Sequence, residues 1–111
     1  MGSAPFRMTM PTQVVLRVLL EEPTQERYGL ELSRACGLPS GTLHPILARL
    51  ERAGWLESSW EEIDPTRVGR PRRRYYRLTK DGCERARSVL TEATAASAAV
   101  RRLRPDLVTG A

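Results

Sequence analysis

The segment that decides the fold is Ser40–Glu51, which reads SGTLHPILARLE. Four apolar side chains within it recur at helical spacing: Leu43, Ile46, Leu47 and Leu50. This period predicts an α-helix that buries one face. Ser40 is expected to cap the helix, which should run from Gly41 to about Ala53. The opposite face is small and hydrogen-bonding near the start of the helix and basic near its end.

A second helix is predicted immediately before this segment, over about Gly29–Cys36. Residues at four-residue spacing define its inner face: Tyr28, Leu32 and Cys36. Gly37 supplies the left-handed residue that commonly follows a helix. Two helices joined by three or four residues, with a glycine in the turn, are typical of a helix-turn-helix.

In a helix-turn-helix, the N-terminal end of the second helix enters the major groove of DNA. Five residues are expected at this groove: Ser40, Gly41, Thr42, His44 and Arg49. The first two should act chiefly through backbone N–H groups, which attract anions at a helix N-terminus. The helix by itself leaves a second interpretation open, in which these residues are only the solvated side of an ordinary helix.

Two strands are predicted after Gly54. Leu56–Trp60 alternates in polarity, and Arg72–Leu78 places Tyr76 and Leu78 on the same face. Tyr76 is expected to be a core aromatic. Residues 64–71 between the strands contain the Asp, Pro and Gly of a hairpin tip. The hairpin should pack on the helices, since two strands alone are marginal. The whole predicts a mainly α fold with a small β-hairpin, a winged helix-turn-helix.

Positive charge is concentrated in this hairpin. Residues 64–80 hold seven basic residues and one acid, a net of +6, whereas the whole chain of 111 residues has a formal net charge of +5. A focused cationic patch is what neutralisation of DNA phosphates requires. Five arginines are expected to contact the backbone or minor groove: Arg67, Arg70, Arg72, Arg73 and Arg77. The alternative is an arginine face that serves solubility alone. The neighbouring acids Glu61, Glu62 and Asp64 are interpreted as a solvated strand end or as ion-pair partners for these arginines.

The last predicted helix is long. It should begin at Thr79, an N-cap residue, and continue to Arg104, a length of roughly 35–40 Å. Small and aliphatic residues recur along it at heptad spacing: Ala86, Val89, Ala93, Ala96, Val100 and Leu103. A domain this small cannot cover such a stripe alone, so we expect the interface of a homodimer. The alternative is packing on the helix's own domain only.

These elements divide the chain into four parts. Residues 1–8 are expected to form a flexible leader and residues 9–78 the winged helix-turn-helix DNA-binding domain. Residues 79–104 form the dimerisation helix and residues 105–111 a tail. The first helix of the domain is predicted over about Pro11–Glu21, capped by Thr9 or Thr12.

Composition narrows the function classes. A hydrophobic content of 41% and a charged content of 28% are ordinary for a soluble domain. Cys36 and Cys83 lie far apart in helical segments, which predicts buried thiols in a reducing cytoplasm, with a redox-sensing role as the alternative. A single histidine and the lack of a cysteine pair argue against a metal site. No cofactor, membrane span or catalytic cluster is expected, so the chain is not expected to be an enzyme.

Several strings together resemble the PadR family of bacterial transcriptional regulators. They are Tyr28–Leu32 (YGLEL), Ser40–Glu51, Gly54–Ser58 (GWLES) and Pro71–Thr79 (PRRRYYRLT), with Gly82 following. The resemblance covers about residues 12–90. The family usually has Tyr where this chain has His44, which alters a contact near the groove. The link between the second and third helices is also short, and the terminal helix is rich in alanine.

The resemblance implies a homodimer, usually a repressor, that binds a palindromic operator, with the long C-terminal helix supplying most of the dimer contact. Some relatives bind flat hydrophobic drugs or phenolics between the dimer halves, using aromatic residues on that helix. No aromatic residue follows Tyr76 here, so a small-molecule effector would not be held in an aromatic sandwich. The alternative function, from a different class, is a winged-helix module that binds RNA or protein without operator specificity.

Overall fold

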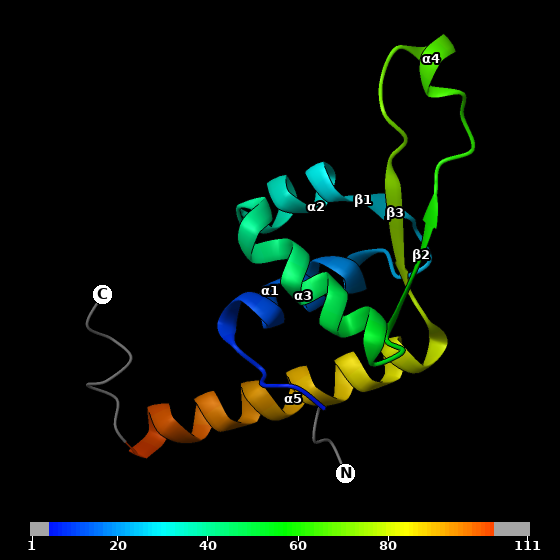
Figure 1. Cartoon of the computed structure of the whole chain (residues 1–111). Coiled ribbons are helices and arrows are strands. Elements are labelled where there is room, and N and C mark those ends of the chain that lie inside the picture. Colours follow the sequence, from blue (N-terminus) through cyan, green and yellow to red (C-terminus); the bar gives the residue numbers. More distant parts are fainter. Residues whose placement is uncertain (1–4, 104–111) are drawn as a thin grey trace.

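The computed structural model describes residues 5–103 (Figure 1). The elements in chain order are α1 (Met10–Glu21), β1 (Arg27–Tyr28), α2 (Gly29–Cys36), α3 (Ser40–Arg52), β2 (Leu56–Trp60), α4 (Pro65–Val68), β3 (Arg74–Leu78) and α5 (Lys80–Leu103). The prediction of a mainly helical winged helix-turn-helix with a long C-terminal helix is confirmed. The predicted end of that helix at Arg104 and the predicted tail lie outside the described residues.

The first three helices pack around one apolar core. Thr9 caps α1, because the Thr12 amide donates to its Oγ1 at 3.4 Å. Most side chains that the helical periodicity assigned to the inner faces are buried: Val15, Leu16 and Leu19 of α1, Leu32 of α2, and Leu43, Ile46, Leu47 and Leu50 of α3. Tyr28 and Cys36, also assigned to the inner face of α2, are only half-buried. The amphipathic pattern therefore identified the core of the helical part.

The turn between α2 and α3 sets the start of the second helix. Gly37 adopts a φ of 66°, and the Leu38 amide donates to the Ser33 carbonyl at 3.1 Å, which closes the end of α2. The prediction that Ser40 caps α3 was wrong, since Ser40 is its first helical residue. Pro39 takes the cap position because its extended backbone leaves its carbonyl free to accept from the Leu43 amide at 3.0 Å.

The sheet has three antiparallel strands in the order β1-β3-β2. The hairpin register pairs Leu56 with Leu78 and Ser58 with Tyr76, and both Tyr76 and Leu78 are buried as predicted. β3 begins at Arg74, two residues later than expected. The strand β1 was not predicted, because a segment of two residues is too short to show an alternating pattern. It joins the hairpin to the start of α2.

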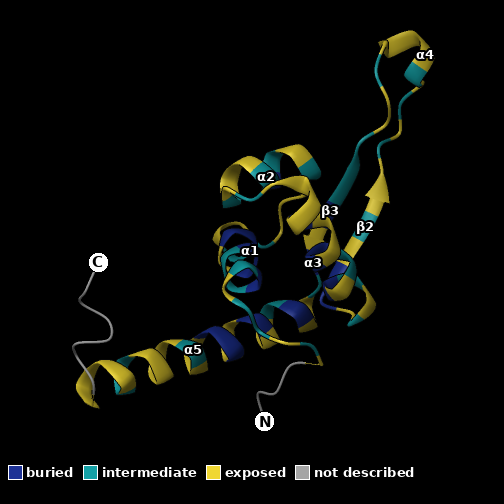
Figure 2. Ribbon diagram, turned by 60° about the vertical axis from the view of Figure 1, so that its left-hand side comes forward, coloured by how far each residue is buried: buried dark blue, intermediate teal, exposed yellow. Residues whose placement is uncertain are grey.

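α5 is anchored at its N-terminal end and extends beyond the rest of the molecule at the other (Figures 1 and 2). The Thr79 hydroxyl accepts from the Gly82 amide at 2.9 Å and donates to the Gly54 carbonyl at 2.7 Å. This cap fixes the helix against the loop that carries Trp55, whose side chain is buried. Thr79 therefore has the capping role that the sequence predicted.

The segment before α1 packs on the fold. The Phe6 ring lies edge-on to Trp55 with a centroid separation of 5.1 Å, and Met8 also packs against the core. The expectation of a flexible leader over residues 1–8 was therefore wrong for Phe6 and Met8. The physical reason is that packing Phe6 on Trp55 removes apolar area of both rings from water. Residues 1–4 lie outside the described part of the chain.

Candidate nucleic-acid interface

The open end of α3 brings together four of the five residues predicted at the groove. Ser40, Gly41, Thr42 and His44 are all exposed within the first turn and a half of the helix. The amides of Ser40 and Gly41 precede the first intrahelical hydrogen bonds, so they carry the partial positive charge of a helix N-terminus. Pro45 follows, where its missing N–H removes one bond near the open end. This end of α3 can therefore donate hydrogen bonds and attract anions.

Arg49 lies apart from these four residues. It is exposed in the last turn of α3 and lines a shallow hollow with Arg52, Phe6 and Ala53. At about 1.5 Å per residue, nine residues separate Arg49 from the start of the helix by roughly 13 Å. It would therefore meet a different part of a bound duplex from Ser40.

The His44 imidazole lies over the start of α2. A Cβ atom built on Gly29 would be 3.1 Å from His44 Cε1 and 3.4 Å from Nε2. A larger residue at position 29 would push the ring outward. Gly29 therefore sets the direction of the one groove residue that departs from the family pattern.

The hairpin β2–β3 extends away from the helices and ends in α4 (Figure 1). Asp64 caps α4 by accepting from the Thr66 amide at 3.0 Å, and Gly69 ends it with a φ of 81°. The tip is thus a capped helical turn, whereas the sequence predicted only turn residues. Arg67 lies on this turn with its side chain exposed.

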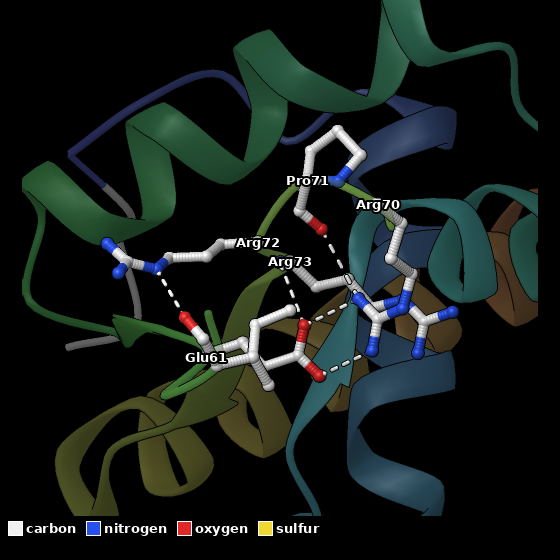
Figure 3. A network of polar contacts seen from close by, with 6 residues as sticks. Glu61, Arg70, Pro71, Arg72 and Arg73 are labelled. Atoms are coloured by element: carbon white, nitrogen blue, oxygen red, sulfur yellow. Dashed lines mark hydrogen bonds and ion pairs between the residues drawn. The ribbon is translucent and has the colours of Figure 1, made fainter. Parts of the chain in front are cut away.

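The base of this tip is closed by a network around Glu61 (Figure 3). The carboxylate accepts from Arg70 Nη1 at 2.7 Å, from Arg70 Nη2 at 2.8 Å and from the Arg73 amide at 3.2 Å. The Glu61 amide donates to the Arg73 carbonyl at 2.8 Å, and Arg72 Nε donates to the Ile63 carbonyl at 2.9 Å. Residues on both sides of the tip are therefore held together by side chains and backbone.

The Arg70 guanidinium beside Glu61 lowers the pKa of that carboxyl to about 2, with help from the Arg73 amide and from nearby positive charge. Because the folded-state pKa lies below the ordinary value of 4.5, the stabilisation from this network is fully present above about pH 4.5. It is lost as the pH falls through about 2. The network is therefore ionised and intact at neutral pH.

Three further arginines of the hairpin contact other groups of the fold. Arg77 Nη2 pairs with Glu57 at 2.6 Å, and the Arg73 guanidinium lies 4.3 Å from the centre of the Tyr28 ring. Arg74 donates to Ser58 and pairs with Glu51 at 3.4 Å. Within residues 5–103, Arg67 forms neither a hydrogen bond nor an ion pair. Among the described residues, three of the predicted wing cations therefore keep guanidinium nitrogens without a hydrogen-bond partner: all those of Arg67, the outer two of Arg72, and those of Arg73, which makes only the ring contact.

The predicted dimer stripe on α5 is also divided. Ala86 and Val89 are buried in the core of their own protomer, so assigning them to a dimer interface was wrong. The domain covers the first half of the stripe because α1 packs along it. Ala93 is half-buried and Ala96 is exposed, as are Val100 (44%) and Leu103 (80%). Of the six residues of the predicted stripe, only these four therefore have exposed surface that a partner could cover.

The cysteines, Tyr76 and the possible metal ligands are further candidate functional groups. Burial raises the pKa of the Cys36 thiol, and both Cys36 and Cys83 are free and half-buried rather than fully buried as expected. Burial also raises the pKa of Tyr76, in keeping with its place in the core. In the described part of the chain, no three metal-ligating side chains are grouped together. Among the helices within residues 5–103, none is both long and apolar enough to cross a membrane.

A family model for the "Transcriptional regulator PadR-like family" matches residues 15–88 of this chain. The chain belongs to the PadR-like family. This match includes the helix-turn-helix, the hairpin and the start of α5. The family model describes PadR-like proteins as transcriptional regulators, so this chain belongs to a family of transcriptional regulators. No curated protein sequence matches the chain.

Solved structures agree with the PadR-like fold. A PadR family regulator from Clostridium difficile R20291 is 20% identical, with a TM-score of 0.68 over 86% of this chain and 98% of that one. A PadR-like regulator from Bacillus cereus is 22% identical, with a TM-score of 0.64 over 83% and 88%. PcaV from Streptomyces coelicolor, solved with its natural ligand, is 23% identical with a TM-score of 0.67 over 86% of this chain. The PadR-like chain spans only 62% of the length of PcaV.

Proposed function

We propose that the protein represses transcription by binding a palindromic operator as a homodimer. The N-terminal end of α3 from each protomer reads the major groove through Thr42 and His44, while the Ser40 and Gly41 amides contact phosphate. Arg67 on each wing contacts the flanking backbone or minor groove, and Arg72 adds a further cation. An operator-bound dimer would block access of the polymerase to the promoter.

The observation that carries this proposal is the projecting wing. Its tip is a capped helical turn that carries Arg67, an exposed side chain with no partner within residues 5–103. In the same molecule, the first turn of α3 is exposed to solvent. Cations that neutralise phosphates supply most non-specific affinity, and side chains at the helix start supply the sequence preference. The wing and α3 therefore have separate roles in one interface.

The exposed half of α5 supports the homodimer. Val100 and Leu103 are apolar side chains left largely in water, and Ala96 between them and the body allows a second helix to approach closely. Exposed apolar residues on one stripe of a projecting helix are typical of a protein interface. A two-fold axis through this stripe would give the protein two α3 helices and thus two half-site contacts.

A competition experiment separates this function from that of an RNA- or protein-binding module. The full-length protein is bound to a labelled duplex at fixed salt and challenged with unlabelled duplex DNA, RNA of the same sequence, and heparin. We expect duplex DNA to compete best, because the open α3 start is matched to a major groove, which double-stranded RNA does not offer to side chains. Equal competition by RNA or heparin would contradict DNA recognition and favour a generic polyanion site.

Replacing Arg67 by Ala should weaken binding to all duplexes alike. Each protomer of the dimer loses one phosphate contact, so the slope of log affinity against log salt should become shallower by about 1.8, at about 0.9 per contact, and affinity at low salt should fall by about tenfold. The slope is measured by titration at four or more salt concentrations. Arg85→Ala is the matched control, because Arg85 lies on α5 and pairs with Asp81. A slope that stays at the wild-type value in the Arg67 variant would remove the wing from the interface.

A further inference from the structure

We propose that Glu61 is a positioning residue for DNA binding: its carboxylate closes the base of the wing so that Arg67 is held toward the duplex, and Arg70 serves this closure instead of contacting phosphate. We call Glu61, Arg70 and Arg73 the wing clasp. The inference rests on the proposed DNA-binding function and assigns roles to two residues within it.

The geometry of the wing clasp is that of a structural closure. Both terminal nitrogens of Arg70 face the two carboxylate oxygens of Glu61, at 2.7 and 2.8 Å. This two-pronged arrangement gives direction as well as attraction, and a lysine cannot reproduce it. The Glu61 side chain is 16% exposed and that of Arg70 is 33% exposed, so both are partly shielded from water while they face each other. The Arg73 amide uses a further lone pair of the same carboxylate.

The wing clasp spans the whole tip. Glu61 lies on the strand side of the loop that enters the tip, whereas Arg70 and Arg73 lie nine and twelve residues later on the side that returns. The backbone pair between Glu61 and Arg73 and the bond from Arg72 to Ile63 cross the same gap. A loop closed in this way is already ordered before DNA arrives. Without the closure, the tip would have to become ordered on binding DNA, and the free-energy cost of that ordering would weaken the affinity.

The negative charge of Glu61 makes the direction of the change in DNA affinity informative. An acidic side chain in a cationic wing repels phosphate, so electrostatics alone predict that removing the charge of Glu61 strengthens DNA binding. Positioning predicts the opposite result, because the neutral side chain cannot hold Arg70 in the same way. The direction of the change in affinity therefore distinguishes the two accounts.

The test measures the affinity of the full-length protein for duplex DNA with Glu61→Gln, and with Glu62→Gln as the matched control. Glu62 is the adjacent acid, it is exposed, and it has the same charge. We expect Glu61→Gln to bind about tenfold more weakly, whereas Glu62→Gln should bind as tightly as the wild type or slightly more tightly. The salt slope should also fall by about 1.8 in Glu61→Gln, because Arg67 of each protomer no longer reaches its phosphate. A loss of folded protein alone would leave that slope unchanged.

A second variant tests the same contact if Glu61→Gln folds poorly. Arg70→Lys keeps the positive charge but loses the two-pronged contact, so it should also bind about tenfold more weakly, and the double variant should show little additional loss. Wild-type affinity in both Glu61→Gln and Arg70→Lys would overturn the positioning role while leaving DNA binding intact. If the wild-type protein itself does not prefer duplex DNA, the proposed function is contradicted, and so is the role of Glu61 in holding Arg67 toward DNA.

Discussion

The variant Gly82→Ala is expected to lose about 3 kcal/mol of folding stability or more, a large share of the total for a domain of this size. A Cβ atom on residue 82 would lie 2.0 Å from the Trp55 carbonyl oxygen and 2.8 Å from its Cα. These are backbone atoms, so they cannot rotate away as a flexible side chain would. Relief requires α5 to move off the Trp55 loop, which breaks the 2.9 Å hydrogen bond from the Thr79 amide to the Trp55 carbonyl.

Urea denaturation followed by circular dichroism measures this loss. Gly41→Ala is the matched control, because Gly41 also lies in the first turn of a helix and nothing comes within 4 Å of a Cβ built there. It should leave stability unchanged or raise it by about 0.5 kcal/mol through helix propensity. Equal stabilities for the two variants would mean that α5 does not approach Trp55 as closely as the structure places it.

Ala96→Glu should convert the protein to a monomer and reduce operator affinity by about 100-fold. A carboxylate in a helix–helix seam must be desolvated without a partner, which opposes association. The loss on DNA follows because one dimer engages two half-sites, and such linkage commonly raises affinity by 10²–10⁴. Sedimentation velocity reports the change in mass, and a binding titration with the operator reports the change in affinity.

Thr94→Glu is the control for this variant. Residue 94 is exposed on α5 and lies about 160° around the helix from Ala96, at about 100° per residue. It should therefore remain dimeric and bind the operator normally. A dimer that survives Ala96→Glu would place the interface elsewhere on the molecule, and monomerisation by both variants would point to a general effect of charge on α5.

The helical part of the fold was predictable because burial imposes a period on the sequence. In α3 the spacing of Leu43, Leu47 and Leu50 identifies the buried face without reference to any other segment. Pattern alone does not reveal what covers a stripe. Ala86 and Val89 continue the same heptad as Ala96, yet the domain's own α1 covers them. The spacing of residues within a helix thus shows which face is buried, but it does not show which segment covers that face.

The wing was predictable in its charge but not in its internal contacts. The concentration of arginine over residues 64–80 is visible in the sequence. The partner of each arginine depends on strand register, which places Glu57 opposite Arg77 and Glu61 near Arg70 across the hairpin. Interpreting Glu61 as an ion-pair partner was one of two readings that the sequence allowed, and the structure confirms it. The contact of Arg73 with Tyr28 depends on β1, which had no sequence signal.

Sequence-specific binding by a dimer is tested by selecting bound fragments from the source genome and footprinting the selected DNA with the protein. We expect a protected inverted repeat whose half-sites are centred about 34–36 Å apart, one helical turn, or a multiple of that distance. Substitution within either half-site should reduce affinity. Fragments with no shared sequence, or a protected segment without two-fold symmetry, would contradict sequence-specific binding by a dimer.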